Sequence, residues 1–167
     1  MDAEARERFI ESWGVMGVAW GINRSMARIH ALLMLADGPV SLDDIADTLE
    51  ISRGNASMSL QKLAGWGVAH KVPIAADRRD FWVSETDIWS MFFAIARERK
   101  RREFDPALAA VREAGAALGD DTPEAVRARL AQLEALLGTG AQVLERFLAN
   151  EQASRALLAF LAAAPRL

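Results

Sequence analysis

A polar run begins at Ser52 and reads Ser-Arg-Gly-Asn-Ala-Ser-Met-Ser. Arginine can bond the edge of guanine through two hydrogen bonds, asparagine can do the same with adenine, and serine can reach bases or phosphates. Taken alone, such a run is equally typical of a short solvated helix face, so its neighbours must decide. The residues of this segment that we expect to contact a nucleic acid are Ser52, Arg53, Gly54, Asn55, Ser57, Ser59 and Lys62.

A second group of cations follows within twenty residues, at Lys71, Arg78 and Arg79. Asp77 and Asp80 flank the arginines, so an ordinary charged turn would look similar. Next to a helix that reads bases, however, contact with phosphate or with the minor groove is the better interpretation. We therefore add these three residues to the candidate DNA-binding set.

The distribution of charge supports an anionic partner more than the total does. The 167-residue chain has a net charge of -3, but residues 51–80 hold five basic side chains against two acidic ones. Residues 97–103 repeat this ratio, and they suit either a solvated helix face or a contact with DNA backbone or a partner subunit. The positive charge is local, as directed binding of a nucleic acid requires.

The chain lacks the residues and motifs that other classes of function would require. The chain has no cysteine and only two histidines, and we find no catalytic triad, phosphate loop or metal-ligand spacing. We expect no enzyme, no metal and no cofactor. The start of the chain does not resemble a signal peptide, and no apolar run reaches the ~20 residues of a membrane span. A cytoplasmic location with no membrane partner is the expectation.

The elements that would position these side chains are two short helices joined by a tight link. Ser41 is a candidate N-cap for a helix with acids at positions 43 and 44, and Ser52 is the candidate cap of a helix that runs to about Gly65. This is the helix-turn-helix pattern. Residues 68–84 then predict a two-stranded hairpin, or wing, in which Pro73 should lie at an edge or near the turn.

The remaining sequence predicts helices. Residues 3–20 and 22–36 have helical apolar spacing, and Gly14 and Gly17 either weaken the first helix or mark a close helix contact. A long helix starts near residue 86, with a kink or a new helix start at Asp105-Pro106, and Gly138 and Gly140 are expected to divide the last stretch into two helices. The expected fold class is mainly α with a small β-hairpin (α+β). Residues 1–104 would form the N-terminal helix and winged helix-turn-helix domain, and residues 105–167 a helical dimerisation or effector region that buries its apolar surface in a homodimer.

The chain has five tryptophans, and three of them, Trp13, Trp20 and Trp89, form a weak candidate effector site. An aromatic cage can bind a small cation such as a quaternary ammonium. Packing in the core is the stronger interpretation of these side chains.

Several runs resemble the GbsR branch of the MarR superfamily of transcriptional regulators. They are Trp20–Leu35, Pro39–Leu49, Ser52–Leu63, Trp66–Val72 and the Asp-Arg-Arg-Asp-Phe-Trp wing from Asp77. The resemblance implies homodimeric repressors or activators, often of osmoprotectant genes, some responding to choline. It places the helix residues above and the two wing arginines on the DNA-facing side. Asn23 stands where the family often has proline, and Met58 where many recognition helices carry a basic residue.

Three hypotheses follow from these observations. The first is a homodimeric regulator, acting as a repressor, that reads a pseudo-palindromic operator in double-stranded DNA with residues 52–65 and the wing. The second is a winged-helix scaffold for protein partners without specific DNA binding, favoured by the negative net charge and the apolar tail. The third adds a small-molecule effector, such as a quaternary ammonium, to the first.

Overall fold

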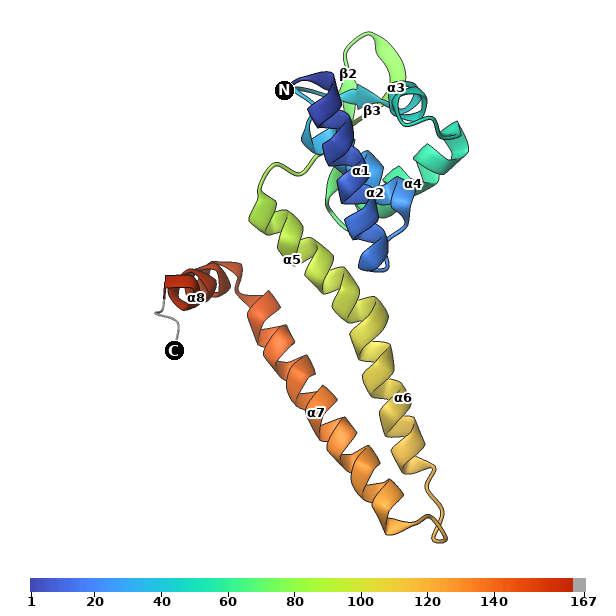
Figure 1. The fold of residues 1–167 in the computed structure, drawn as a ribbon, viewed down its shortest axis with the longest axis vertical. Helices are drawn as coiled ribbons and strands as arrows, with labels where there is room; N and C mark the ends of the chain where they lie inside the picture. Colours follow the sequence, from blue (N-terminus) through green and yellow to red (C-terminus); the bar gives the residue numbers. More distant parts are fainter. Residues whose placement is uncertain (164–167) are drawn as a thin grey trace. The chain divides into compact units, whose positions relative to one another are not determined.

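The computed structural model describes residues 1–163 and is mainly helical, with a small antiparallel sheet (Figure 1). The predicted fold class is thereby confirmed. The elements are α1 (Ala3–Ala19), α2 (Arg24–Met34), β1 (Val40–Ser41), α3 (Leu42–Thr48), α4 (Arg53–Gly65), β2 (Ala69–Ile74), β3 (Asp77–Ser84), α5 (Ile88–Arg99), the π-helical turn η1 (Lys100–Phe104), α6 (Asp105–Ala116), α7 (Glu124–Ala149) and α8 (Glu151–Ala163). No helix among these described residues is both long and apolar enough to cross a bilayer.

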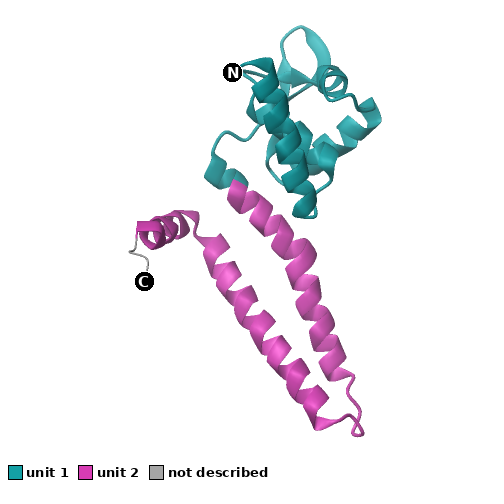
Figure 2. Ribbon diagram, viewed as in Figure 1, with its two compact units in different colours: residues 1–91 teal, residues 92–167 magenta. Residues whose placement is uncertain are grey.

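The chain divides into two compact units, residues 1–91 and residues 92–167 (Figure 2). The first unit contains the helix-turn-helix and the sheet, and the second contains the long helices. The predicted boundary after residue 104 separates a DNA-binding region from a dimerisation or effector region. It is a boundary between functions, not between compact units, and it stays a prediction.

The core of the first unit surrounds α2. The fully buried side chains include Ile29 and Leu32 of α2, Ile45 of α3 and Leu60 of α4. Val68, just before β2, is also fully buried. Since each of these helices is short, burial of its apolar stripe rather than intrinsic propensity stabilises it. This packing fixes α3 and α4 against α2 and so fixes the direction of their polar faces.

α1 packs closely on α2 at a glycine. A Cβ atom at Gly17 would lie 2.5 Å from the Cβ of Ala27, so only glycine allows this approach. The same two helices are joined by Glu11 of α1, which pairs with Arg28 at 2.6 Å and with Arg24 at 2.7 Å. Of the two readings of this glycine, the close helix contact is therefore confirmed.

The sheet has the strand order β1-β3-β2 and contains one strand that the sequence did not predict. β1 is only two residues long, and its Val40 pairs with Trp82 of β3. A segment this short has no period that a sequence pattern could reveal. Pro73 lies in the edge strand β2, where the register shifts between Val72 and Ile74, as predicted for a residue that cannot donate to the ladder.

In the second unit, α6 and α7 pack together, and α7 corrects one prediction. Gly138 and Gly140 do not divide it, because the helix continues from Glu124 to Ala149. The break comes at Asn150, whose φ of -133° leaves the helical region and whose side chain accepts from the backbone of Ala153 at the start of α8. A glycine costs a helix only up to ~1 kcal/mol, which packing of the long helix offsets. A kink or a new capped helix start was predicted at Asp105-Pro106. α6 does begin at Asp105 with proline in its first turn, but it follows η1 directly, without a side-chain cap, and the backbone stays helical there.

Candidate nucleic-acid interface

The turn between α3 and α4 is built from two serine caps. Ser41 accepts a hydrogen bond from the backbone N–H of Asp44, and Ser52 accepts one from that of Asn55 at 3.2 Å. Glu50, between the helices, has a φ of 53°, which reverses the chain within a few residues. The predicted helix-turn-helix is thus present, and both predicted caps are confirmed.

The start of α4 presents a solvent-exposed face. Ser52, Arg53, Gly54 and Lys62 are exposed, and Ser57 is half-buried. A Cβ at Gly54 would touch nothing within 4 Å in this chain, so internal packing does not require glycine there. Met58 is 62% exposed on the same helix. This face combines hydrogen-bonding side chains, one apolar side chain and an open approach to the backbone.

Two of the candidate residues on α4 point inward. The Asn55 side-chain amide donates to Ser25 Oγ at 3.1 Å, and Ser59 Oγ donates to Asn55 Oδ1 at 3.3 Å. Ser59 is buried, while Asn55 is half-buried. The expectation for Ser59 is therefore revised: it lies on the core side of α4, because it sits one turn after Asn55 and next to the fully buried Leu60. Asn55 links α4 to α2 in addition to any contact with DNA.

The wing carries the three predicted cations, in two different states. Lys71 pairs with Asp80 at 2.7 Å, and Arg79 pairs with Asp77 at 2.7 Å. The Arg79 guanidinium lies 5.0 Å from the centre of the Phe81 ring. Its hydrogen bonds lower the pKa of Asp77, and Asp77 in turn raises the pKa of Arg79. Arg78 is exposed and makes no ion pair with any residue that the structure describes.

One feature of this surface escaped the sequence prediction. Asp43 and Asp44 were expected only to favour the start of α3, but Asp43 Oδ1 lies 3.0 Å from Arg53 Nε. Asp44 Oδ2 lies 4.0 Å from Arg79 Nη1. Ten residues separate Asp43 from Arg53, and no sequence pattern joins them. Carboxylates therefore contact both the helix and the wing cations.

The basic run of residues 97–103 is engaged within the second unit. Arg97 pairs with Glu151 at 2.9 Å, and Arg101 pairs with Glu98 at 2.7 Å. Lys100, on η1, is held between Asp105 and Glu145 at 2.9 and 2.8 Å, and these partners raise its pKa. These pairs favour the structural interpretation of the run over contact with DNA.

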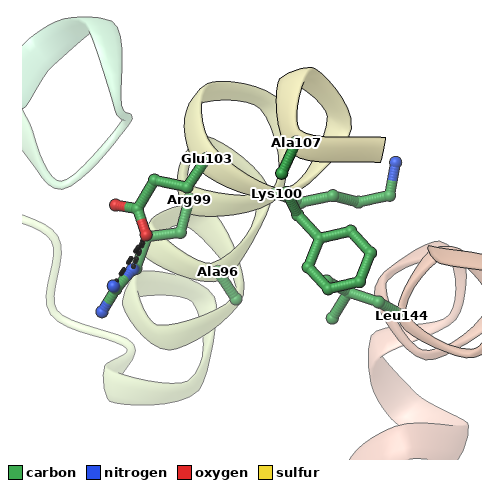
Figure 3. A pocket seen from close by; sticks show the side chains of 7 residues that line it. Ala96, Arg99, Lys100, Glu103, Ala107 and Leu144 are labelled. Atoms are coloured by element: carbon green, nitrogen blue, oxygen red, sulfur yellow. Dashed lines mark hydrogen bonds and ion pairs between the residues drawn. The ribbon is translucent and has the colours of Figure 1, made fainter. Parts of the chain in front are cut away.

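A cavity of about 380 Å³ opens beside this π-helical turn (Figure 3). The Arg99–Glu103 pair borders it on one side, and Leu144 of α7 lies on the other. The atoms exposed to the cavity are almost all apolar, even though three of the lining residues are charged. The lining residues are Ala96, Arg99, Lys100, Glu103, Phe104, Ala107 and Leu144. Such a lining offers a small polar ligand few groups to bind.

The three candidate effector tryptophans occupy different environments. Trp13 is half-buried and stacks on Phe9, with ring centres 5.5 Å apart, and lies 6.1 Å from the ring of His30. Trp20 follows the end of α1 and is 50% exposed, and Trp89 lies in the first turn of α5. Packing thus accounts for Trp13, and the effector site stays a prediction. Among the described residues there is no cluster of three side chains that could hold a metal ion.

Comparisons with known proteins agree with this geometry. Residues 20–80 match the model of the MarR family. Over 115 residues, 69% of this chain, the sequence is 26% identical to the HTH-type transcriptional repressor GbsR of Bacillus subtilis (strain 168), and the match spans 63% of that protein. A crystal structure described as a transcriptional regulator is similar with a TM-score of 0.67 at 21% identity, covering 90% of this chain and 99% of the other. The predicted resemblance to GbsR and MarR-type winged helix-turn-helix proteins is confirmed.

Proposed function

We propose that this chain, in which residues 20–80 match the model of the MarR family, is a homodimeric, DNA-binding transcriptional regulator that acts as a repressor. One observation carries the proposal. The exposed first turn of α4 and the Arg78-bearing wing belong to one compact unit, and both offer the donors that DNA bases and phosphates accept.

In this proposal α4 enters the major groove and the wing follows the backbone. The N-terminal end of a recognition helix usually contacts the base edges, and here that end carries Arg53 and Gly54. Ser52, Ser57 and Lys62 would contact bases or phosphates beside it. The wing cations would neutralise phosphate and reach the minor groove, as arginine does in many complexes. Met58 offers an apolar contact instead of a charge, so we expect Arg53 to supply most of the base reading.

The second unit would join two copies. α7 and α8 leave large apolar side chains exposed, namely Leu133, Leu136, Val143, Leu157, Phe160 and Leu161. Exposed apolar area of this kind marks an interaction surface, and a second copy of the chain is the simplest partner. Two copies would present two α4 helices about one DNA turn (~34 Å) apart, which suits a pseudo-palindromic operator. Sedimentation velocity at micromolar concentration tests the dimer directly.

The proposal extends to location and chemistry. A regulator of this kind acts where the DNA is, and a cysteine-free chain suits the reducing cytoplasm. The proposed role needs no catalysis, and binding of DNA without turnover is the expected activity.

A small-molecule effector would be a quaternary ammonium held by aromatic faces. The observation in favour is that Trp20 and Trp89 are both about half exposed in the first unit. A titration of choline or betaine followed by tryptophan fluorescence tests this proposal, with Trp89→Leu as the variant. An identical fluorescence spectrum at every ligand concentration would rule out the effector proposal and leave the DNA-binding proposal unaffected.

The DNA-binding proposal is tested by fluorescence anisotropy with the DNA that lies upstream of the protein's own gene. Wild type should bind this DNA more tightly than a shuffled duplex, and Arg53→Ala should reduce that preference by about 1–3 kcal/mol. Arg78→Ala should weaken binding to both duplexes alike and lower the salt slope by about one.

Arg8→Ala is the matched control, because Arg8 is an exposed cation of α1 in the same unit and is not part of the candidate set. If wild type shows no salt-dependent binding to either duplex and instead forms a stable complex with another protein, the scaffold hypothesis replaces the regulator.

A further inference from the structure

Two neighbouring carboxylates of α3 contact the two cationic elements of the proposed DNA-binding surface. Asp43 lies 3.0 Å from Arg53 at the first position of α4, and Asp44 lies 4.0 Å from Arg79 of the wing. α3 packs on both α4 and β3, so one short helix places both acids (Figure 1). Asp80 does the same for Lys71 within the hairpin.

The fold does not need the Asp43 pair. The N-cap of α3 is Ser41, and its partners are the backbone N–H and the carboxylate of Asp44. The Asp43 and Arg53 side chains are 44% and 67% exposed, and ion pairs this open to water contribute little to stability. The pair therefore places a negative charge at the DNA-facing side of α4 without a matching structural benefit.

A carboxylate and a phosphate are equivalent partners for a guanidinium, since both accept its paired N–H donors. To contact DNA, Arg53 must exchange Asp43 for a base or a phosphate, and Asp43 then remains near the phosphate backbone. Non-specific binding depends on phosphate neutralisation almost alone, whereas specific binding also gains from base contacts. An acid in this position thus weakens non-specific complexes proportionately more.

We propose that Asp43 is a specificity-determining residue that competes with DNA phosphate for Arg53 and keeps the affinity of this surface for non-operator DNA low. The proposal rests on the proposed DNA-binding function. Asp44 acts in the same way on Arg79, but it also belongs to the cap of α3, so Asp43 is the residue to test.

The test compares Asp43→Asn with Asp47→Asn. Asp47 is an exposed acid in the same short helix and forms no ion pair within residues 1–163, so the two variants change the net charge equally. Anisotropy titrations with a random-sequence duplex, at several salt concentrations, should show that Asp43→Asn binds about fivefold more tightly than wild type. Its salt slope should be steeper by up to about one. Asp47→Asn should remain close to wild type.

A second comparison isolates the pair. In an Arg53→Ala background, Asp43→Asn should have at most a small effect, because the cation for which it competes is absent. Circular dichroism melts of each variant establish that the folded fractions are equal.

The outcomes separate the two proposals. If wild type binds neither this random-sequence duplex nor the DNA upstream of its own gene at low salt, the proposed function is wrong. If wild type binds and Asp43→Asn equals Asp47→Asn, bulk charge explains the result and the role of Asp43 is overturned. The proposal is equally overturned if Asp43→Asn keeps its full effect in the Arg53→Ala background, because Asp43 then does not act through Arg53.

Discussion

Asn55 links the first turn of α4 to the start of α2, because its side-chain amide donates to Ser25 Oγ at 3.1 Å. Its carbonyl oxygen accepts from Ser59 Oγ, so both ends of the amide are bonded within the protein. Ser25 lies two residues after Asn23, whose side chain caps the start of α2. The orientation of the proposed recognition helix is thereby tied to the start of a core helix.

Removing this link should cost stability as well as binding. Asn55→Ala leaves Ser59 without its acceptor and breaks the bond to Ser25, so we expect the free energy of unfolding to fall by about 1–2 kcal/mol. Urea denaturation measures it, and Ser57→Ala on the same helix serves as the control with little change. Unchanged stability with a loss of operator preference would mean that Asn55 acts on the bases and not on the fold.

Buried His30 should make stability depend on pH. Its side chain is 3% exposed, its Nε2 has no hydrogen-bond partner among the described residues, and burial lowers its pKa to about 4. The unfolded chain, with a histidine pKa near 6.5, binds a proton first as the pH falls. Stability from this group is therefore complete above pH 6.5 and is lost progressively down to pH 4, by roughly 3 kcal/mol in total.

His30→Leu tests this assignment because leucine keeps the volume and removes the titration. The stability difference between His30→Leu and wild type should grow as the pH falls from 7 to 5, as measured by urea denaturation at each pH. Parallel pH profiles for His30→Leu and wild type would contradict the assignment.

Local signals made much of the first unit predictable. Ser41 and Ser52 are N-cap residues that mark the two helix starts in the sequence, and the apolar residues after them repeat at helical spacing. The helix-turn-helix could therefore be predicted without tertiary information. β1 could not be predicted from the sequence, because a two-residue strand is defined only by its pairing with β3.

The site was less predictable, since it depends on contacts between elements. The inward direction of Asn55 follows from the position of Ser25 on another helix, thirty residues away. The pair of Asp43 with Arg53 likewise depends on how α3 and α4 cross. A polar stripe in the sequence therefore identifies the helix face but not which of its side chains are already bonded.

The close contact of α1 with α2 should tolerate no added methyl group. In Gly17→Ala the new Cβ would lie 2.5 Å from the Cβ of Ala27, and neither atom can move without its helix. We expect a loss of about 1–3 kcal/mol despite the higher helix propensity of alanine. Thermal melts measure this loss. In the double variant Gly17→Ala/Ala27→Gly, removal of the opposing methyl group should restore part of it, and a lack of rescue would mean that the backbone itself is in conflict.

The two glycines that failed to divide α7 provide a matched pair for the last prediction. A Cβ at Gly138 would meet nothing within 4 Å, whereas a Cβ at Gly140 would lie 3.0 Å from the tip of the Phe104 ring. Alanine favours a helix interior over glycine by up to ~1 kcal/mol, so Gly138→Ala should raise the melting temperature.

Gly140→Ala gains the same propensity but must displace the Phe104 ring, which lines the cavity beside η1. Its melting temperature should therefore stay below that of Gly138→Ala. In a Phe104→Leu background the added methyl meets a smaller side chain, so the two glycine variants should become similar. If Gly140→Ala is as stable as Gly138→Ala with Phe104 in place, the ring yields freely, and Gly140 is not required for the packing of η1 on α7.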